Sequence, residues 1–554
     1  MTALVLDTFA YFSVLLRGFI LAAQSLTVGG IVFAAFLLIP VGGRLDADEE
    51  SAWRATRRLV TFSALALAFI EALSLAQMVF VLVQSTEMPA ADALGASYAI
   101  SRATGSAAAL GIALLARVGL RRMLPWIGLL AAAIIAGSTA TSHAAARMGQ
   151  RDILLIADAL HQLGAAAWIG GIPYFLMTLR RCRTGEAIRT VGRRFSVMSM
   201  VSVATIVAAG VLMSLSYIDS LQALYGTAYG AMLMTKTALF GCVLLLAALN
   251  YGVVERVRRN PMTSITRLRR FAEAEVAIGV TVLFMAASLT SMPPAVDLPS
   301  DRLTASELIE RLLPGGPPRL VSPSRAELSN LTMEQHAERA ALAQRSVQSF
   351  NLADTDPNLA RTDGDRAWSE FNHNWAGIFM LAIGLLALAE RTGRARWARY
   401  WPLVFLGLAA FLFIRSDPSN WPMGDNGFFE SFADTESLQH RLIVLLVVAF
   451  SFFEWGVRTG YVRSPRAALV FPILTGIGAA FLLTHSHALS NFKDALLVEY
   501  SHLMIGFFGV VAGWSRWLEL RLPPENATIP SWIWRICFVV IGLILIFYRE
   551  TAAL

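Results

Sequence analysis

The chain has 554 residues, of which 56% are hydrophobic and 15% charged, and its formal net charge at pH 7 is +7. A soluble protein of this length needs far more charge to cover its surface, so the composition excludes that class. Most of the basic residues lie in short connections between apolar segments. We therefore expect the positive charge to set membrane orientation, and we expect no nucleic-acid partner.

Long apolar runs predict an all-α polytopic membrane protein surrounded by lipid. These runs are long enough, or nearly so, to cross about 30 Å of hydrocarbon as helices. They also lack the alternating pattern of membrane-barrel strands. In chain order we expect about fourteen spans. They are 11–40, 60–84, 103–120, 124–141, 153–178, 195–217, 229–250, 271–291, 373–390, 401–415, 440–457, 467–484, 495–515 and 530–548.

Arginine residues gather in alternate connections and indicate which side of the membrane each connection faces. The basic connections are 41–59, 179–194, 251–270, 391–400 and 456–466. Short loops rich in Arg and Lys face the cytoplasm, so these loops are predicted to lie inside and both chain termini outside. The first nine residues carry Asp7 and no basic residue, so we do not expect a cleaved signal peptide.

A polar segment divides the spans into two halves. Residues 296–370 are rich in charge and include a proline-rich stretch, which predicts a periplasmic linker. The predicted domains are thus an eight-helix half, 1–295, and a six-helix half, 371–554. The two halves show a similar order of polar residues around one outer turn each. That order favours a parallel duplication over chance similarity of two short loops.

All eight histidines fall on the predicted outer side, in outer loops or at the outer ends of spans. Imidazole is a common ligand of borderline-soft metal ions and titrates near neutral pH. The one-sided set therefore predicts an outward-facing metal or haem site. The expected ligands are His143, His161, His373, His440, His485, His487 and His502. The eighth, His336, lies in the linker, where we expect it to be solvated.

Two carboxylates share a helix face with a histidine three residues later. They form the pairs Asp158–His161 and Glu499–His502. A carboxylate beside a ligating imidazole fixes its tautomer, which predicts second-shell roles for Asp158 and Glu499. Ionisable groups this far below the membrane surface are costly and usually functional. The alternative is a buried polar pair that ties helices together.

Other candidates carry less specific signals. His485 and His487 flank one residue and would chelate one ion if the backbone there is extended, whereas His373 and His440 also fit simple interfacial positions. Lys236 lies mid-span and is expected to pair with a carboxylate, either as a structural ion pair or in a proton relay. Met292 is a weaker candidate ligand for Cu(I).

The three cysteines form no Cys-x-x-Cys pair, so a thiolate site of the copper-chaperone kind is not encoded. Metal chemistry must therefore rest on histidine, methionine and carboxylate side chains. The sequence also carries none of the usual catalytic motifs or nucleotide-binding loops, so it gives no reason to expect an enzyme.

One stretch resembles a known family. The run Asp158-Ala-Leu-His161-Gln-Leu-Gly-Ala-Ala-Ala-Trp168-Ile-Gly-Gly171 is similar to the characteristic helix of the copper resistance protein D (CopD) family. The resemblance covers about residues 10–295. Its motifs are specific as a combination and not singly. Its other motifs are Arg194-Phe195-Ser196, Tyr229-Gly230 before Lys236, Asn250, and Leu289-Thr-Ser-Met-Pro-Pro294.

The resemblance implies a bacterial inner-membrane protein that handles periplasmic copper beside a soluble periplasmic copper carrier. We match the six-helix half to no family. The leading hypothesis is a copper-binding protein that takes up or transfers copper through its outward-facing histidines. The alternative is a redox protein that binds haem b between paired histidines in the outer half of the membrane. A proton-coupled permease using Asp158, Glu499 and Lys236 is the third reading.

Overall fold

The fold is described from a computed structural model. The described residues are 9–42, 49–86, 88–147, 149–182, 184–260, 263–300, 302–313, 317–324, 363–415, 420–424, 427–429, 435–484 and 493–550, without the side chains of 10–11, 435–439 and 494. Across these ranges every regular element is a helix. The prediction of an all-α membrane protein is confirmed.

The chain forms two compact units, which we describe separately. Unit 1 consists mainly of Met1–Ser300, and unit 2 mainly of Asp301–Gln344 and Ala353–Leu554. Within the described ranges, thirteen helical segments are long and apolar enough to cross a membrane.

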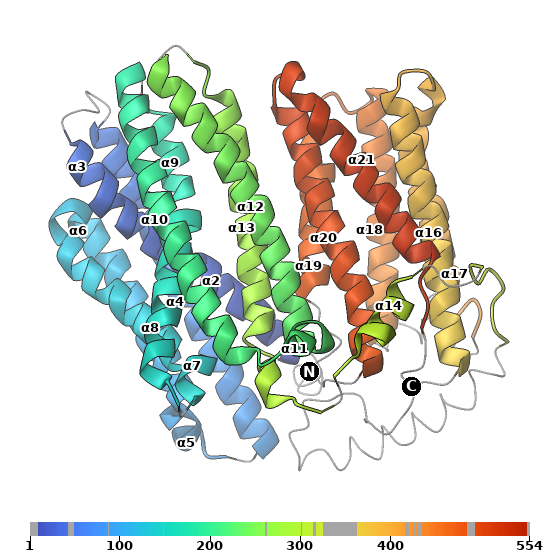
Figure 1. Cartoon of the computed structure of the whole chain (residues 1–554), viewed down its shortest axis with the longest axis horizontal. Coiled ribbons are helices and arrows are strands. Elements are labelled where there is room, and N and C mark those ends of the chain that lie inside the picture. Colours follow the sequence, from blue (N-terminus) through green and yellow to red (C-terminus); the bar gives the residue numbers. More distant parts are fainter. Residues whose placement is uncertain are drawn as a thin grey trace. The chain divides into compact units, whose positions relative to one another are not determined.

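Unit 1 is a bundle of long helices (Figure 1). Most of them run beyond the apolar core into the basic connections. The first span contains α2 (Phe9–Phe33), the π-helical turn η1 (Ala34–Leu38) and α3 (Ile39–Val41). The following long helices are α4 (Glu49–Thr86), α6 (Ser97–Ala140), α8 (Arg151–Ala165), α9 (Ile172–Leu179), α10 (Gly185–Tyr217), α12 (Ala228–Arg259) and α13 (Thr266–Leu289). The π-helical turn η3 (Ala166–Gly170) joins α8 to α9.

The segment α6 is a helical hairpin. Its backbone leaves the helical conformation at Gly119. The Ser101 hydroxyl donates a hydrogen bond of 2.7 Å to the Gly137 carbonyl, so the two arms lie side by side and antiparallel. The arms correspond to the predicted spans 103–120 and 124–141. Counted separately, they bring the thirteen segments to the fourteen expected.

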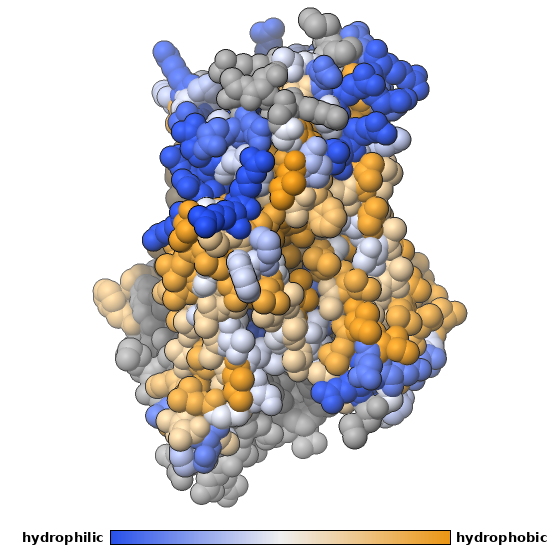
Figure 2. Space-filling view, turned by 90° about the vertical axis from the view of Figure 1, so that its left-hand side faces the viewer, coloured by the Kyte–Doolittle hydropathy of each residue, from blue (hydrophilic) through white to orange (hydrophobic). Residues whose placement is uncertain are grey.

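The arginine-rich connections of unit 1 meet at one end of the bundle. The Arg181 guanidinium donates to the Ser51 hydroxyl at 3.1 Å, and Arg269 donates to the Leu179 carbonyl at 3.1 Å. The three predicted cytoplasmic loops of this unit are therefore neighbours, as the orientation requires. Figure 2 shows a hydrophilic end above a broad apolar band. On α4 the Phe62 side chain is 69% exposed, which suits a side chain facing lipid.

Unit 2 contains six spans, and each coincides with a predicted one (Figure 1). The helices are α16 (Asp363–Arg391), η6 (Arg396–Leu403) with α17 (Val404–Arg415), α18 (Thr435–Thr459), η8 (Ala467–Leu469) with α19 (Val470–Thr484), α20 (Lys493–Arg521) and α21 (Pro524–Ile546). The helix α16 begins at Asp363, within the segment predicted as the linker. The short helix α14 (Ala305–Leu312) also belongs to this unit.

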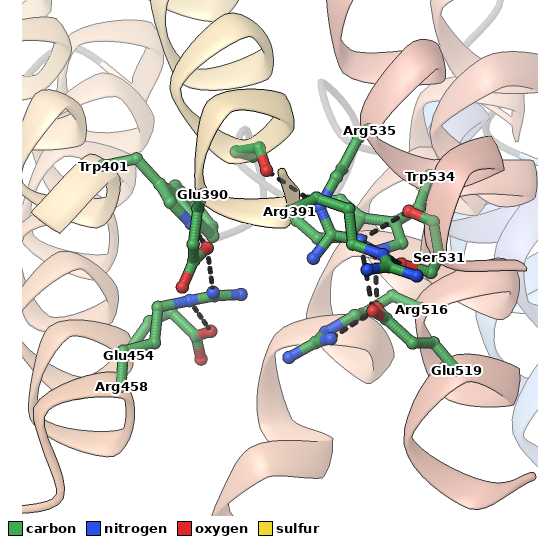
Figure 3. A network of polar contacts seen from close by, with 11 residues as sticks. Glu390, Arg391, Trp401, Glu454, Arg458, Arg516, Glu519, Ser531, Trp534 and Arg535 are labelled. Carbon is green, nitrogen blue, oxygen red and sulfur yellow. Dashed lines mark hydrogen bonds and ion pairs between the residues drawn. The ribbon is translucent and has the colours of Figure 1, made fainter. Parts of the chain in front are cut away.

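A network of arginine, glutamate and tryptophan side chains ties the helices of unit 2 together near their basic ends (Figure 3). Glu390 accepts hydrogen bonds from Arg458 at 2.7 Å and from Trp401 at 3.1 Å. Glu519 accepts from Trp534 at 2.6 Å and from Arg535 at 3.1 Å. Charge-assisted bonds of this kind satisfy buried charged groups, so the network holds this end of the bundle closed.

The orientation in the membrane remains a prediction. We expect a reporter fused after Arg194 or after Arg270 to be located in the cytoplasm. A reporter fused within residues 300–365 should be located in the periplasm. Alkaline phosphatase and a cytoplasm-active fluorescent protein at each position would check this, and a periplasmic signal at Arg194 would overturn the one-sided placement of the histidines.

Candidate metal site

The predicted outer end of unit 1 contains an open cavity of about 190 Å³. It is lined by His143, Ala146, Arg147, Pro294 and Asp297. The Arg147 guanidinium donates to the Asp297 carboxylate at 3.0 Å and closes one side of the cavity. This ion pair connects the end of the short helix α7 (His143–Ala146) to the 3-10 helix η4 (Ala295–Asp297), so residues far apart in sequence form a single cavity wall.

His143 begins α7 (His143–Ala146) and lies in this wall. Its ring packs edge-on against Tyr217 of α10, with ring centres 6.4 Å apart. Burial lowers the pKa of His143, against the opposing effects of a hydrogen bond with the Leu289 backbone and the charge of Asp297. The imidazole is therefore neutral at pH 7, which is the form that binds metal ions. Its Nε2 atom is buried and makes no hydrogen bond among the described residues.

Asp158 of α8 lies at the centre of a group of polar side chains. Its charge acts on His143, on Tyr217 and Tyr229, and on Lys236 of α12. The Oδ2 atom of Asp158 is buried and accepts no hydrogen bond within the described part of the chain. A buried carboxylate oxygen without a donor is costly, and binding a cation would offset that cost.

His161 lies one turn further into α8, on the same face as Asp158. Its Nδ1 atom is 3.0 Å from the Ile206 carbonyl of α10. A carbonyl oxygen can only accept, so Nδ1 carries the proton and Nε2 carries the lone pair that can bind a metal. Gly210 leaves room for this ring, since a Cβ there would lie 3.4 Å from its Cε1 atom. The partner that orients His161 is thus a backbone carbonyl.

Lys236 forms no ion pair with a carboxylate within the described residues. Its charge acts on both His161 and Asp158, so the ammonium group lies on the same side of α12 as the candidate ligands. The expected carboxylate interaction is therefore electrostatic and involves Asp158. Met292 is buried, at 2% exposure, two residues before Pro294 of the cavity wall.

The helix that carries Asp158 and His161 is held against α2. The Gln24 amide of α2 donates to the Gln162 side chain at 2.9 Å. Immediately after α8, Gly170 in η3 lies directly against the α2 backbone, and a Cβ at this position would be only 1.8 Å from the Ser25 carbonyl oxygen. The π-helical turn and its glycines thus fix the depth and rotation of the two candidate ligands.

In unit 2 the structure brings His373 of α16 close to His502 of α20, with ring centres 6.0 Å apart. Glu499 is buried one turn from His502 on the same helix. His440 lies in α18, half-buried. His485 and His487 lie outside the described residues. Across the described ranges, no three His, Cys, Asp or Glu side chains gather where one metal ion could bind all of them.

Several residues of these sites were not anticipated from the sequence. They are Tyr217 and Tyr229 in unit 1, and Arg311 and Tyr548 in unit 2. The three tyrosines contact or influence a candidate ligand, and Arg311 contacts Tyr548, only through the tertiary fold, so no local spacing could have revealed them. The Tyr229-Gly230 motif was noticed only as part of the family resemblance.

Comparison with known proteins identifies the family. A family model described as Copper resistance protein D matches residues 189–289. Copper transport protein CutJ of Bacillus subtilis (strain 168) is 35% identical over 157 residues, which is 28% of this chain and 28% of that protein. The chain therefore spans little more than a quarter of CutJ. No solved structure matches the chain.

A second relative extends over more of its own length. Copper resistance protein D of Pseudomonas syringae pv. tomato is 30% identical over 217 residues, which is 37% of this chain and 70% of that protein. These similarities agree with the resemblance of the Asp158–Gly171 stretch and with the bundle of membrane-crossing helices. The chain belongs to the copper resistance protein D family.

Proposed function

We propose that unit 1 binds copper on the outer side of the bacterial inner membrane, as the first step of copper uptake or transfer from the periplasm. One observation carries the proposal. Two buried atoms that can bind a metal, Nε2 of His143 and Oδ2 of Asp158, make no hydrogen bond among the described residues, and the two groups interact electrostatically. Buried polar groups are normally satisfied, so this pair is well suited to bind a cation.

The cavity at His143 supports an entry route from the predicted periplasmic side. His161 would accept the ion at a deeper level, since its Nε2 carries a lone pair. The positive charge of Lys236 repels a cation that moves deeper into the bundle. The negative charge of Asp158 would offset this repulsion. Imidazole and carboxylate ligands together suit copper, which is also the metal named for both relatives. We expect a soluble periplasmic copper carrier as the donor.

Copper binding by variants of the full-length protein tests this proposal. We expect His143→Asn and Asp158→Asn each to weaken copper binding at unit 1 by about 10–100-fold, because each removes a ligand or the charge that stabilises the ion. Affinity would be measured in detergent by competition with a chromophoric copper chelator, together with elemental analysis and a visible spectrum.

The matched control is Asp152→Asn, which removes an exposed carboxylate from the first turn of the same helix. This variant should bind copper as the parent protein does. If His143→Asn and Asp158→Asn also keep the parent affinity, the two groups serve helix packing and the proposal fails. A Soret band in the spectrum would instead support the haem alternative.

A further inference from the structure

The outer histidines of unit 2 are outside the function proposed for unit 1, yet two of them meet in the fold. His373 lies in α16 and His502 in α20, and their rings are 6.0 Å apart between centres and nearly perpendicular, at 87°. The two helices are far apart in the sequence, so this approach is a property of the folded unit. It needs a chemical explanation, because each imidazole is a polar ring half-buried in a membrane-crossing helix.

Both rings are held in the same tautomer. The Nδ1 atom of His373 is 2.8 Å from the Ser369 carbonyl, and that of His502 is 3.0 Å from the Val498 carbonyl. Each carbonyl can only accept, so both Nδ1 atoms carry the proton and both Nε2 atoms carry the lone pair. Fixing one ring nitrogen with a backbone carbonyl is a common way to prepare the other nitrogen as a metal ligand.

The separation of the rings suits one shared ion. With metal–nitrogen bonds of about 2 Å, two imidazoles that bind one ion have their nitrogens at most about 4 Å apart, and their ring centres lie about 5–6 Å apart. The observed separation of 6.0 Å between ring centres lies within this range. Zinc prefers four ligands and calcium prefers oxygen ligands. Cu(I) is the soft ion that two neutral imidazoles alone can hold.

The surroundings of the pair are aromatic and partly buried. The Tyr548 ring stacks on His373 with centres 4.0 Å apart, and the Arg311 guanidinium lies 4.3 Å from the centre of the Tyr548 ring. Tyr548 is 3% exposed and Arg311 is 5% exposed. The two histidines themselves are half-buried beside these side chains.

Arg311 belongs to α14, which covers this part of unit 2. The Arg311 guanidinium donates to the Leu497 carbonyl at 3.3 Å, and the Glu307 carboxylate accepts from Lys493 at 2.9 Å. Both contacts attach α14 to the beginning of α20, just before His502. A capping box at Thr304 fixes the start of the short helix. The linker is therefore part of the wall of the histidine site.

We infer that unit 2 holds a second copper site, in which His373 and His502 bind one Cu(I) ion through their Nε2 atoms. The choice of copper rests on the function proposed for unit 1. The existence of the site rests only on the separation of the two rings and on the tautomer in which both are held. Unit 2 then stores or receives Cu(I) on the same side of the membrane on which unit 1 binds copper.

The test counts copper ions in the full-length protein. Metal-free protein in detergent is given Cu(I) without oxygen, and the bound ions are counted by elemental analysis after removal of excess. We expect two ions per chain in the parent and one in His502→Asn or His373→Asn. His502→Met should restore two, because a thioether binds Cu(I) whereas a carboxamide does not. If His502 served helix packing alone, His502→Met and His502→Asn would bind the same number of copper ions.

His336→Asn is the matched control, since it removes another histidine of the predicted outer side and should leave both ions bound. Two ions in the double variant His373→Asn with His502→Asn would overturn the inference, as would a Soret band that this double variant removes. His143→Asn separates the two proposals. If it loses nothing while His502→Asn loses copper, the site in unit 2 stands and the proposal for unit 1 fails.

Discussion

Replacing Glu71 by glutamine should destabilise unit 1 by about 3–5 kcal/mol, because the change leaves the Arg102 charge buried without its partner. The Arg102 guanidinium donates to the Glu71 carboxylate at 2.7 Å, and the two side chains are 1% and 5% exposed. Arg17 lies close enough for its charge to act on both groups, so loss of the carboxylate also adds repulsion between two cations. Thermal unfolding in detergent would measure the effect.

Two comparisons make this result specific. Glu50 lies on the same helix and forms an exposed ion pair with Arg54; the two side chains are 77% and 58% exposed, and Glu50→Gln breaks this pair. It should change stability by less than about 1 kcal/mol. The double variant Glu71→Gln with Arg102→Gln buries no charge, so it should be less destabilised than the two single changes added together. If Glu71→Gln unfolds at the temperature of the parent, this ion pair does not stabilise the bundle.

The spans could be predicted because a membrane helix must be apolar along its whole crossing, and that requirement is visible in the sequence. The break expected between the spans 103–120 and 124–141 is confirmed, since the backbone leaves the helical conformation at Gly119. Many helices are longer than the predicted spans. Their ends extend beyond the hydrocarbon and are polar, so the apolar runs in the sequence did not include them. α16 begins at Asp363, ten residues before the predicted start, for this reason.

The candidate site was predictable in part. The spacing of Asp158 and His161 correctly puts them on one helix face, since residues three apart are neighbours there. It could not show that His161 is oriented by the Ile206 carbonyl, because that partner is 45 residues away on another helix. The same limit applies to Tyr548, which stacks on His373 from the far end of the chain.

The proposed duplication predicts equivalent surroundings for His161 and His502, and the two differ in one respect. His161 is hydrogen-bonded to a neighbouring helix, whereas His502 is hydrogen-bonded to Val498 of its own helix. Both partners are backbone carbonyls and both bonds are made by Nδ1, so the ring nitrogen presented as a ligand is the same. The chemistry of the two histidines thus agrees although their packing does not.

The change Gly170→Ala should damage both the stability of unit 1 and its copper site. A Cβ at position 170 would lie 1.8 Å from the Ser25 carbonyl oxygen and 2.5 Å from the Ser25 carbonyl carbon. Both are backbone atoms, so no side-chain rotation relieves the overlap and α2 must move away from η3. We expect a loss of about 3 kcal/mol, at the upper end of the usual cost of overpacking. The displacement also strains the Gln24–Gln162 hydrogen bond, so copper should bind unit 1 more weakly.

Gly128→Ala and Gly241→Ala are the matched controls, because a Cβ at either position meets no atom within 4 Å. Alanine is favoured over glycine inside a helix by about 0.5–1 kcal/mol, so these two variants should be as stable as the parent or slightly more stable. Melting temperature and copper affinity would be measured on all three. Parent-like values for Gly170→Ala would mean that the close contact of η3 with α2 does not position Asp158 and His161. A loss confined to Gly170→Ala would tie the geometry of these two ligands to the π-helical turn that follows them.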